Sequence, residues 1–486
     1  MGTLTFCTML YAMTVTIASV ALPRMQGAMG ATTDQIAWVV TFNLVATAVA
    51  TPTTGWLVAK FGQRRLMMIS VLGFAVASLG CGLSTSLEQL VMFRMFQGLF
   101  GAPIVPTSQS IVLRTFTPAQ QPSVMAVFGM GVVMGPILAP TIGGYLAEEY
   151  GWRWVFFMVV PIAGAAFAGV MATVRDNENE SPVKLDWTGF IALSLAVAAT
   201  QLALDRGERN DWFESSEIII EVFIAALALY IFIAHGLTHD RPFLNFKLFK
   251  DRSFSFGILF AFVFGMLNFL PLVLLPPMLQ TLQNYPESTI GMILATRGFG
   301  TLTGFGLMAV LSRFDPRIWL TIGFGLQGFS GIAMAQMGIE LTAFDIAWNS
   351  YLHGLGVGIS WVPVTQIAFG RLAPKDAADA SAVFNLLRNF GTSMFISICI
   401  AVVLRTSKFA NAGLVENISP LNEMLRYPGV MGAWSLETLP ALAAVNGEIA
   451  RQATMIGYIN AFYLSGIVSL LVIPLTWLVG SPKAQR

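Results

Sequence analysis

Hydrophobic residues form long, nearly continuous runs along the whole chain, separated by short polar segments. A helix needs about 20 mostly apolar residues to cross a bilayer core of about 30 Å. The runs do not alternate between polar and apolar positions, so they favour helices over the strands of a β-barrel. The pattern predicts an all-α integral membrane protein with 14 transmembrane helices, at approximately 3–23, 36–58, 66–85, 88–112, 123–147, 154–174, 187–204, 216–236, 253–276, 288–310, 318–338, 345–369, 381–404 and 453–480.

The composition excludes several other classes of protein. The 486 residues are 55% hydrophobic and 11% charged, whereas a soluble domain carries about 25% charged residues. A soluble enzyme, a secreted domain and a disordered chain are therefore excluded. The net charge of +1 offers no basic field for nucleic acid. Cys7, Cys81 and Cys399 are isolated within apolar runs, which argues against a disulfide framework or a zinc site.

The Lys and Arg residues indicate how the helices are oriented. An even number of spans places both termini on one side of the membrane. If that side is the cytoplasm, sixteen Lys and Arg fall in cytoplasmic segments, eight fall on the opposite side, and Arg94, Arg297 and Arg388 lie within spans. Because Lys and Arg near spans stay in the cytoplasm, this bias predicts that both termini are cytoplasmic.

Two charged segments divide the chain. Residues 175–186 and 237–252 bracket the seventh and eighth spans. The expected domains are a six-helix bundle at 1–174, a linker with two inserted transmembrane helices at 175–252, and a second six-helix bundle at 253–486. Two such repeats around a central cavity are typical of transporters. The long loop 405–452 is expected on the periplasmic side, partly as an amphipathic helix on the membrane surface.

The loop after the second span is rich in glycine and basic residues. Gly55 and Gly62 allow two helix ends to turn closely. Lys60, Arg64 and Arg65 can interact with helix C-termini of the other half and hold a closed state. Simple anchoring of the loop in the cytoplasm explains the same residues equally well.

Arg94 lies inside an apolar span. An uncompensated guanidinium at the centre of a bilayer costs at least about 2.5–3.5 kcal/mol on insertion scales. We therefore expect Arg94 to face a cavity or a partner. The alternative is a structural arginine bonded to backbone carbonyl groups.

The fifth span is rich in small residues and proline. Small residues allow close helix packing in lipid, and prolines bend a helix. This pattern therefore predicts a packing interface, and it is not a nucleotide-binding loop because it lies mid-span and position 134 is not glycine. The residues are Gly129, Gly131, Gly135, Pro136, Pro140, Gly143 and Gly144.

These motifs together resemble the major facilitator superfamily, and most closely its fourteen-helix drug:proton antiporter branch, the EmrB/QacA-like proteins. Further resemblance comes from Ala21-Leu22-Pro23, Trp152-Arg153-Trp154, Leu204-Asp205-Arg206-Gly207 and Asn385-Leu386-Leu387-Arg388-Asn389. The resemblance implies two six-helix bundles plus two inserted helices, and export of drugs by alternating access across the inner membrane. It also implies that Arg94 tunes proton release by a nearby acid, that the fifth span forms the interface between halves, and that a periplasmic adaptor and an outer-membrane channel are partners.

The chain departs from the family pattern at three positions. Thr14 stands where the branch usually has an Asp in the first span, and threonine cannot release a proton near neutral pH. Ala59 stands where the superfamily motif usually has an Asp, which EmrB-like members often lack too, and Asn43 stands where the family tends to have a Tyr. We therefore expect proton coupling to be altered, absent or carried by another group.

Asp345 and His353 are candidates for that other group. Eight residues are a little over two helical turns, so both side chains face one side of a helix about 12 Å apart, and histidine titrates near neutral pH. The alternatives are a helix N-terminal acid for Asp345 and a hydrogen-bonded polar residue for His353. Arg297 and Arg388 add positive charge to the C-terminal half, which favours an anionic or zwitterionic substrate.

Several polar residues within the predicted spans are candidate cavity residues. A large apolar cavity with a few polar anchors suits an amphipathic organic molecule or a lipid, and the 24 Met, 37 Phe and 11 Trp fit adaptable apolar contacts. Hydrogen bonding between helices is the alternative role for each one. The residues are Asn43, Gln97, Gln109, Asn268, Gln366 and Asn385.

Three functions can be compared. A secondary exporter of amphipathic or hydrophobic compounds explains most of the pattern. A lipid or lysolipid translocator on the same fold, with altered or no proton coupling, is the alternative. A membrane enzyme is disfavoured because the chain has three His, no H-E-x-x-H, no Cys–His pair and no G-x-S-x-G. No catalytic residue, cofactor or metal is expected, and His235 and His239 form at most a weak metal site.

Overall fold

A computed structural model describes the chain except for residues 32, 118–119, 176–184, 209, 240–241, 245, 374–375, 419–437 and 480–486. The described residues form α-helices and short 3-10 helices, and no strand occurs among them. The predicted all-α fold is therefore confirmed.

The first part of the chain forms antiparallel helices that are interrupted near prolines. A 3-10 turn containing Pro52 separates α2 from α3, and Pro103 lies between α5 and α6, because proline cannot donate the backbone hydrogen bond that continues a helix. The helices are α1 (Gly2–Met29), α2 (Thr33–Ala50), η1 (Thr51–Thr53), α3 (Thr54–Phe61), α4 (Gln63–Leu83), α5 (Leu87–Gly101), α6 (Ile104–Thr115), α7 (Gln121–Glu149), α8 (Trp154–Phe157) and α9 (Val159–Thr173).

The rest of the chain continues the same up-and-down pattern. Its helices are α10 (Trp187–Arg206), η2 (Trp212–Glu214), α11 (Ser216–Thr238), η3 (Phe246–Lys250), α12 (Arg252–Asn268), α13 (Leu270–Gln283), α14 (Glu287–Leu311), α15 (Pro316–Ala335), α16 (Ala343–Phe369), α17 (Ala377–Glu416) and α19 (Leu439–Thr476). Helix lies at all fourteen predicted positions.

The length and hydropathy of the described helices account for twelve of the fourteen predicted membrane crossings. Twelve helices or helix pairs in the described part of the chain are long and apolar enough to span a bilayer. The other two predicted spans coincide with α1, of which Gly2–Ala18 is a shorter apolar stretch, and with the interrupted series from α2 to α3. The total of fourteen crossings therefore stays a prediction.

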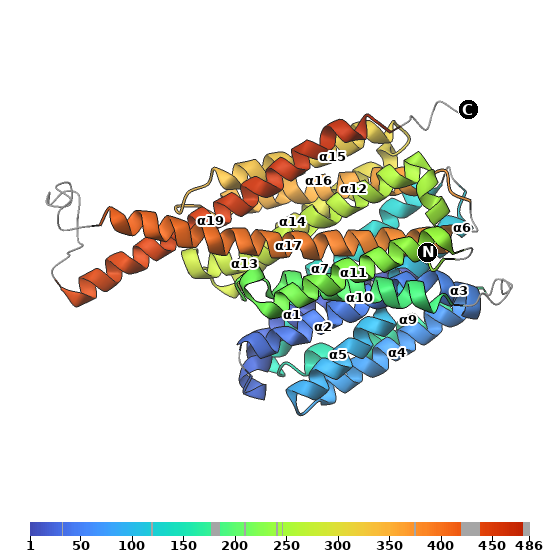
Figure 1. Cartoon of the computed structure of the whole chain (residues 1–486), viewed down its shortest axis with the longest axis horizontal. Helices are drawn as coiled ribbons and strands as arrows, with labels where there is room; N and C mark the ends of the chain where they lie inside the picture. Colours follow the sequence, from blue (N-terminus) through green and yellow to red (C-terminus); the bar gives the residue numbers. More distant parts are fainter. Residues whose placement is uncertain are drawn as a thin grey trace.

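The helices gather into two groups that lie side by side. Figure 1 shows α1, α2, α4, α5 and α9 on one side of the molecule and α12, α14, α15, α16 and α19 on the other. The groups meet where α7 packs against α14 and α16, and where α17 packs against α6 and α3. We call this contact the seam. It is the place where a site shared by both groups has to form.

The helices α10 and α11 form an antiparallel pair beside the seam. They pack against each other, and α10 also contacts α2 and α17, so the pair touches both groups (Figure 1). Thr41 of α2 donates a hydrogen bond to Asp205 of α10 over 2.7 Å, and Gln201 of α10 donates one to Ser393 of α17. This position fits an insertion between two bundles, while the exact domain boundaries stay predictions.

The two longest helices extend beyond the rest of the molecule. With 40 and 38 residues, α17 and α19 are about 57–60 Å long, roughly twice the thickness of the bilayer core. Figure 1 shows their ends projecting at the end opposite to the one where α1 begins. Within the predicted loop 405–452, residues 405–416 and 439–452 therefore continue these helices. The predicted separate helix on the membrane surface is absent from the described part of that loop.

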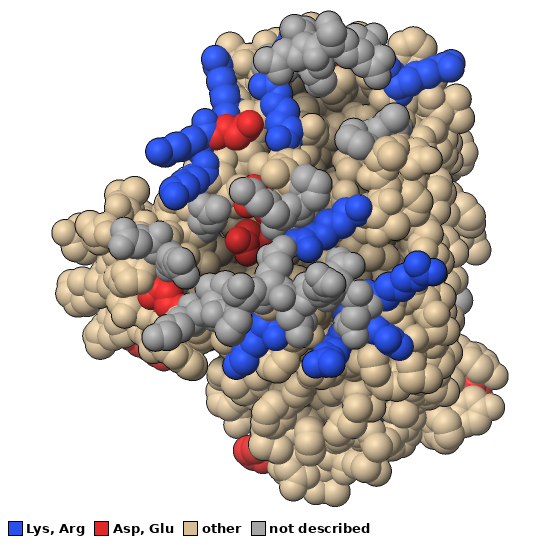
Figure 2. Space-filling view, turned by 90° about the vertical axis from the view of Figure 1, so that its right-hand side faces the viewer, with Lys and Arg blue, Asp and Glu red and all other residues tan. Residues whose placement is uncertain are grey.

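The end of the molecule where α1 begins and α19 ends is basic. Lys and Arg side chains gather on this face in Figure 2, with few acidic side chains among them. Lys60, Arg64, Arg114, Arg252 and Arg317 all lie at helix ends on this side. The distribution fits the rule that basic residues stay in the cytoplasm.

Candidate functional site

The guanidinium of Arg94 is buried inside the first group of helices. Arg94 is 1% exposed. Its Nε donates a hydrogen bond to the carbonyl oxygen of Val39 over 3.1 Å, and its Nη1 donates one to Gln97 Oε1 over 2.5 Å. Asn43 in turn donates to the backbone carbonyl of Arg94 over 2.8 Å. Arg94 thus points at helices α2 and α5 rather than at acyl chains, and its partners are neutral oxygens.

The six predicted cavity residues all take part in hydrogen bonds between or within helices. Asn43 and Gln97 belong to the network of Arg94, and Gln366 donates to Ser312 O over 3.1 Å. Asn268 accepts a hydrogen bond from Arg297, and Asn385 donates one to Gln109. These residues therefore stabilise the helix packing through hydrogen bonds, which is the alternative role that the sequence left open.

Arg297 and His353 come together in the second group of helices. Arg297 of α14 is 5% exposed and donates to Asn268 Oδ1 over 2.7 Å and to the Asn268 carbonyl. His353 of α16 is 7% exposed, and its Nδ1 has no hydrogen-bond partner among the described residues. The next residue, Gly354, packs directly against the carbonyl group of Arg297. The close packing of α14 on α16 therefore places a cationic side chain and an imidazole in one buried region.

Asp345 is not part of that region. It lies at the start of α16, where its carboxylate accepts hydrogen bonds from the hydroxyl and the N–H of Thr342, and its own N–H donates to Thr342 Oγ1. This reciprocal arrangement is a capping box. Asp345 is exposed whereas His353 is buried, so their shared spacing does not bring them into one site.

Thr14 is buried in α1. Its hydroxyl donates to the carbonyl oxygen of Leu10 over 2.8 Å, and the side chain is 1% exposed. The hydroxyl is therefore engaged by its own helix. A proton carrier is missing from the place where the antiporter pattern has an acid.

The basic loop between α3 and α4 interacts mainly within its own group of helices. The ammonium of Lys60 lies 4.6 Å from the centroid of the Trp56 ring. Arg64 donates to the carbonyl oxygen of Met171, near the C-terminus of α9, over 2.8 Å. In this structure Arg64 therefore contacts its own group of helices, and binding to a helix C-terminus of the other half stays one of the two interpretations that the sequence left open. Arg65 is exposed at the start of α4.

Gly55 forms the contact of this motif with the other group. A Cβ atom on Gly55 would collide with the carboxylate of Asp379 at the start of α17. A side chain at this position would thus push α3 away from α17.

The small residues of α7 serve both groups of helices. Side chains at Gly131 and Gly143 would collide with Thr5 and Ile17 of α1, and a Cβ on Gly135 would lie 2.5 Å from the carbonyl oxygen of Met9. Gly129 faces Phe305 of α14 and Trp361 of α16 instead. The helix continues without a break from Gln121 to Glu149, so Pro136 does not interrupt it. The side chains of Pro140 and Gly144 lie outside the described residues.

Arg388 occupies the seam itself. This residue of α17 is half-buried, and its guanidinium carbon lies 5.5 Å from the centroid of the Trp361 ring of α16. Its Nη2 donates to the amide oxygen of the adjacent Asn389 over 3.1 Å. Tyr11 of α1 packs inside the first group, with its ring centroid 6.1 Å from that of Phe74 in α4.

Trp361 is the residue that the sequence alone did not identify. It is an aromatic position in an apolar run, where a residue in the seam and a residue in contact with lipid have the same pattern. Only the packing of α16 against α7 and α17 distinguishes the two.

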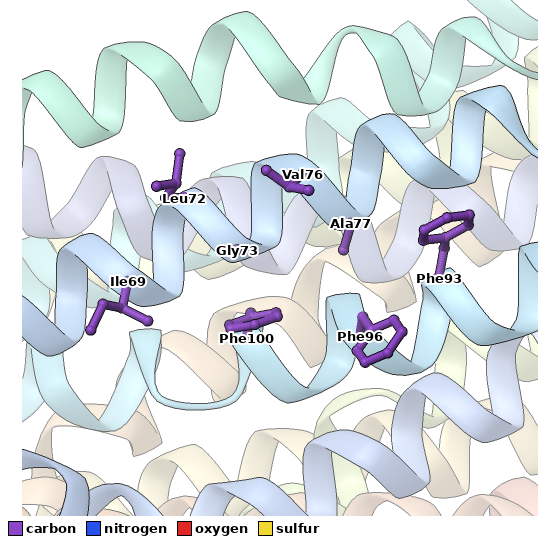
Figure 3. A pocket seen from close by; sticks show the side chains of 8 residues that line it. All are labelled: Ile69, Leu72, Gly73, Val76, Ala77, Phe93, Phe96 and Phe100. Carbon is purple, nitrogen blue, oxygen red and sulfur yellow. The ribbon is translucent and has the colours of Figure 1, made fainter.

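A shallow cavity lies elsewhere, on the outer surface of the first group. Its volume is about 350 Å³, and all of its lining residues belong to α4 and α5 (Figure 3). Leu72, Val76 and Phe96 are each more than 40% exposed there. Because this lining is apolar and faces outward from two membrane-spanning helices, the cavity is a lipid-facing hollow rather than part of the seam.

His235 and Asp186 form a polar contact at the basic end of α10 and α11. Asp186 caps α10 by accepting from Gly189 N over 3.0 Å, and it lies 2.9 Å from His235 Nε2 and 3.0 Å from Phe243 N. Burial raises the pKa of Asp186, but these three hydrogen bonds outweigh burial and hold the pKa below its ordinary value. The rings of His235 and His239 stack at 4.7 Å. Among the described residues, no group of three or more His, Cys, Asp or Glu could hold a metal.

Comparison with known proteins identifies the family. The model of the Major Facilitator Superfamily matches residues 4–396. The chain is 33% identical over 493 residues to the multidrug export protein EmrB of Escherichia coli (strain K12), covering 99% of this chain and 94% of that protein. It is 30% identical over 474 residues to the fatty acid resistance protein FarB of Neisseria gonorrhoeae, covering 96% and 93%.

A solved structure supports the same fold. The proton:xylose symporter XylE superposes with a TM-score of 0.65 at 12% identity, covering 99% of this chain and 95% of that one. This similarity concerns the fold alone. With the family match and the full-length relatives, it shows that the chain belongs to the major facilitator superfamily.

Proposed function

We propose that this chain is a secondary transporter that exports hydrophobic and amphipathic organic compounds by alternating access. The observation that carries the proposal is the position of Arg388, whose guanidinium lies at the seam between the two helix groups. A guanidinium inside a membrane is costly, and Arg388, unlike Arg94 and Arg297, is not enclosed within one helix group. Relatives named for multidrug export and for fatty acid resistance supply the direction and the kind of compound.

The seam is closed at the basic end of the molecule. Asn385 of α17 bonds Gln109 of α6 over 2.8 Å, and Ser123 of α7 donates to the carbonyl oxygen of Ala309 in α14 over 3.1 Å. Alternating access requires these contacts to break when the cytoplasmic side opens. We take the basic end as the cytoplasmic end, with both termini there and the protein in the inner membrane.

Proton coupling is the finer part of the proposal. Thr14 has no titratable group and Asp345 is engaged in a helix cap, so His353 beside Arg297 is the remaining candidate among the residues identified from the sequence. In water an imidazole titrates near neutral pH, so the proposal is that His353 carries the coupled proton, taken up in a conformation in which water reaches it.

The partners that the resemblance implies are a periplasmic adaptor and an outer-membrane channel. The ends of α17 and α19 are the part of the described chain that reaches furthest from the basic end (Figure 1). An adaptor on the periplasmic side meets these helices first. Lipid or lysolipid translocation is not favoured, because the relatives named above are exporters and resistance proteins, and family membership favours a transporter over an enzyme.

Transport by the purified protein in vesicles tests the proposal. We expect the vesicles to move a hydrophobic dye against its gradient when a proton gradient is imposed. Empty vesicles are the control. Failure to move any of several hydrophobic compounds, with a correctly folded protein, would contradict the exporter assignment. Strictly gradient-dependent transport that is abolished by Asp345→Asn would contradict the role given to His353.

A further inference from the structure

The membrane interior of this protein carries positive charge without a matching acid. In the helices of the two predicted six-helix bundles, every Asp and Glu except Glu448 lies within three residues of a helix end. Glu448 belongs to the projecting part of α19. Arg94, Arg297 and Arg388 are instead the eighth, eleventh and twelfth residues of α5, α14 and α17. Three interior guanidinium groups therefore need oxygens from somewhere other than carboxylates of these helices.

Two of the three arginines already have such oxygens. Arg94 is 1% exposed and bonds a backbone carbonyl and the amide oxygen of Gln97. Arg297 is 5% exposed and bonds both the carbonyl and the amide oxygen of Asn268. Their positions are closed within one helix group, so these two charges hold helices together.

Arg388 differs in each respect. It is half-buried rather than buried, it lies at the seam, and its hydrogen bond goes to the amide of the next residue along the chain, Asn389. It forms no ion pair with any described acid. A guanidinium has five N–H donors in a planar fork, so most of the donors of Arg388 are left for another acceptor.

A further donor lies beside this guanidinium. The indole that lies 5.5 Å from it belongs to Trp361, which is 4% exposed and whose Nε1–H has no partner among the described residues. A buried N–H without an acceptor is costly, and an anion placed here would satisfy it. Phe264 and Phe384 also pack against Trp361, which provides apolar surface beside the donors.

We infer that Arg388 and Trp361 form a subsite for the anionic head group of an amphipathic substrate, a carboxylate or a sulfonate, whose apolar part lies against the aromatic residues of the seam. The planar fork of an arginine matches the oxygens of such a group, and the bond is stronger away from water. The inference rests on the proposed export function and specifies its preferred substrate as an organic anion.

Two probes with the same ring system test this inference. Anilinonaphthalene sulfonate carries a permanent negative charge, and phenylnaphthylamine is the same framework without the sulfonate. Binding of each is measured by titration calorimetry with the full chain in nanodiscs of zwitterionic lipid, with the heats of empty nanodiscs subtracted. Zwitterionic lipid removes anionic lipid as a competing occupant.

The expected result is a selective loss. Arg388→Gln should weaken binding of the sulfonate about 10-fold or more, the factor for one lost hydrogen bond to a charged group, and leave the neutral probe within about 2-fold. Arg388→Lys should retain part of the affinity for the anion. Arg405→Gln is the matched control, because Arg405 lies on the same helix, exposed and paired with Glu208, about 26 Å away.

The other outcomes are decisive as well. Equal weakening of both probes by Arg388→Gln, or unchanged binding of the sulfonate, overturns the anionic subsite. Binding of the neutral probe alone by the wild-type chain overturns the subsite but leaves the export proposal in place. If the wild-type chain binds neither of these probes nor transports other hydrophobic compounds, both proposals fail.

Discussion

Asn385 of α17 donates a hydrogen bond of 2.8 Å to the side-chain oxygen of Gln109 in α6, across the seam and 276 residues apart in the chain. Both side chains are buried. A hydrogen bond of this kind contributes about 0.5–1.5 kcal/mol net. It therefore shifts the equilibrium between the open and closed states of the basic end several-fold towards the closed state.

Removing this bond should open the basic end more often. We expect Asn385→Ala, and equally Gln109→Ala, to increase labelling of a cysteine placed at Ser381 by a membrane-impermeant maleimide several-fold. Ser381 is buried one turn from Asn385, and its backbone carbonyl also accepts from that residue. The double variant should add little beyond either single variant, because the two residues share one bond.

A bond within one helix group is the control for this prediction. Thr321 of α15 and Thr476 of α19 lie 3.1 Å apart through their hydroxyl oxygens, and neither borders the seam contact. Thr321→Ala should leave the labelling rate unchanged. Equal labelling in all variants would show that the Asn385–Gln109 bond does not hold the seam closed.

Close packing of α7 on α1 predicts that Gly135 cannot carry a side chain. A Cβ atom there would lie 2.5 Å from Met9 O and 2.8 Å from Met13 N, both backbone atoms. We expect Gly135→Ala to lower the free energy of unfolding by about 1–3 kcal/mol, the usual cost of overpacking. The shift of the melting temperature of the purified protein measures this effect.

A second glycine in a helix provides the matched control. No atom lies within 4 Å of a Cβ built on Gly306 of α14, so Gly306→Ala should be neutral or slightly stabilising, since alanine is the better helix former. A melting temperature that falls equally in both variants would attribute the effect to the loss of glycine itself rather than to the contact with α1.

Much of the fold could be predicted from the sequence because the bilayer imposes it. Backbone groups in hydrocarbon must be satisfied within the helix, so each apolar run had to be helical. The interruption at Thr51–Thr53 follows from Pro52, a local signal. The extension of α17 and α19 could not be predicted, because residues 405–416 and 439–452 lack the continuous apolar run by which a spanning helix is recognised.

The candidate site was predictable where a rule of burial applies. A guanidinium in an apolar run has to face the interior, and Arg94 does. The role of Asp345 also had a sequence signal, since Thr342 precedes it by three residues as in a capping box. The hydrogen-bond partners of the arginines were not predictable. Val39 and Gln97 supply oxygens to Arg94, and Asn268 supplies them to Arg297. Only the pairing of helices in the folded chain brings these groups together.

The contact of Asp186 predicts a stability that depends on pH. Because the pKa of this carboxyl lies below its ordinary value in the folded protein, its stabilising effect is present above the unfolded pKa, near 3.9, and is lost as the pH falls through the lower folded value. We expect the melting temperature of the wild type to fall below about pH 4. The part of this fall that comes from protonation of Asp186 should be absent in Asp186→Asn.

The comparison of pH profiles isolates this carboxyl from the others. Asp251 is a suitable control, because it also caps a helix, by accepting from Ser253 N and Phe254 N, but has no histidine partner in the described structure. Asp251→Asn should keep the component that Asp186→Asn loses. Identical profiles for wild type and Asp186→Asn would contradict the assignment.

Asp345 and His353 should behave differently when each is replaced. Asp345→Asn removes the carboxylate of the capping box and should cost about 0.5–2 kcal/mol of stability, the usual value of a helix cap, without changing the response of transport to a proton gradient. Thr342→Ala, which breaks the same capping box and keeps the acid, should have a similar effect on the melting temperature. The agreement of these two variants would assign Asp345 to the cap.

His353→Gln should have the opposite profile. Its side chain is buried beside Arg297 and has no N-cap role, so we expect the melting temperature to change little while the dependence of dye transport on the proton gradient is reduced or lost. Transport is measured in vesicles with the gradient imposed and then collapsed by an ionophore. If His353→Gln vesicles still respond to the gradient as the wild type does, protons are carried by a different group or the transport is uncoupled. The wild-type vesicles distinguish these two cases. If their transport rate is unchanged after the proton gradient is collapsed, transport is uncoupled, because a coupled carrier loses its driving force with the gradient.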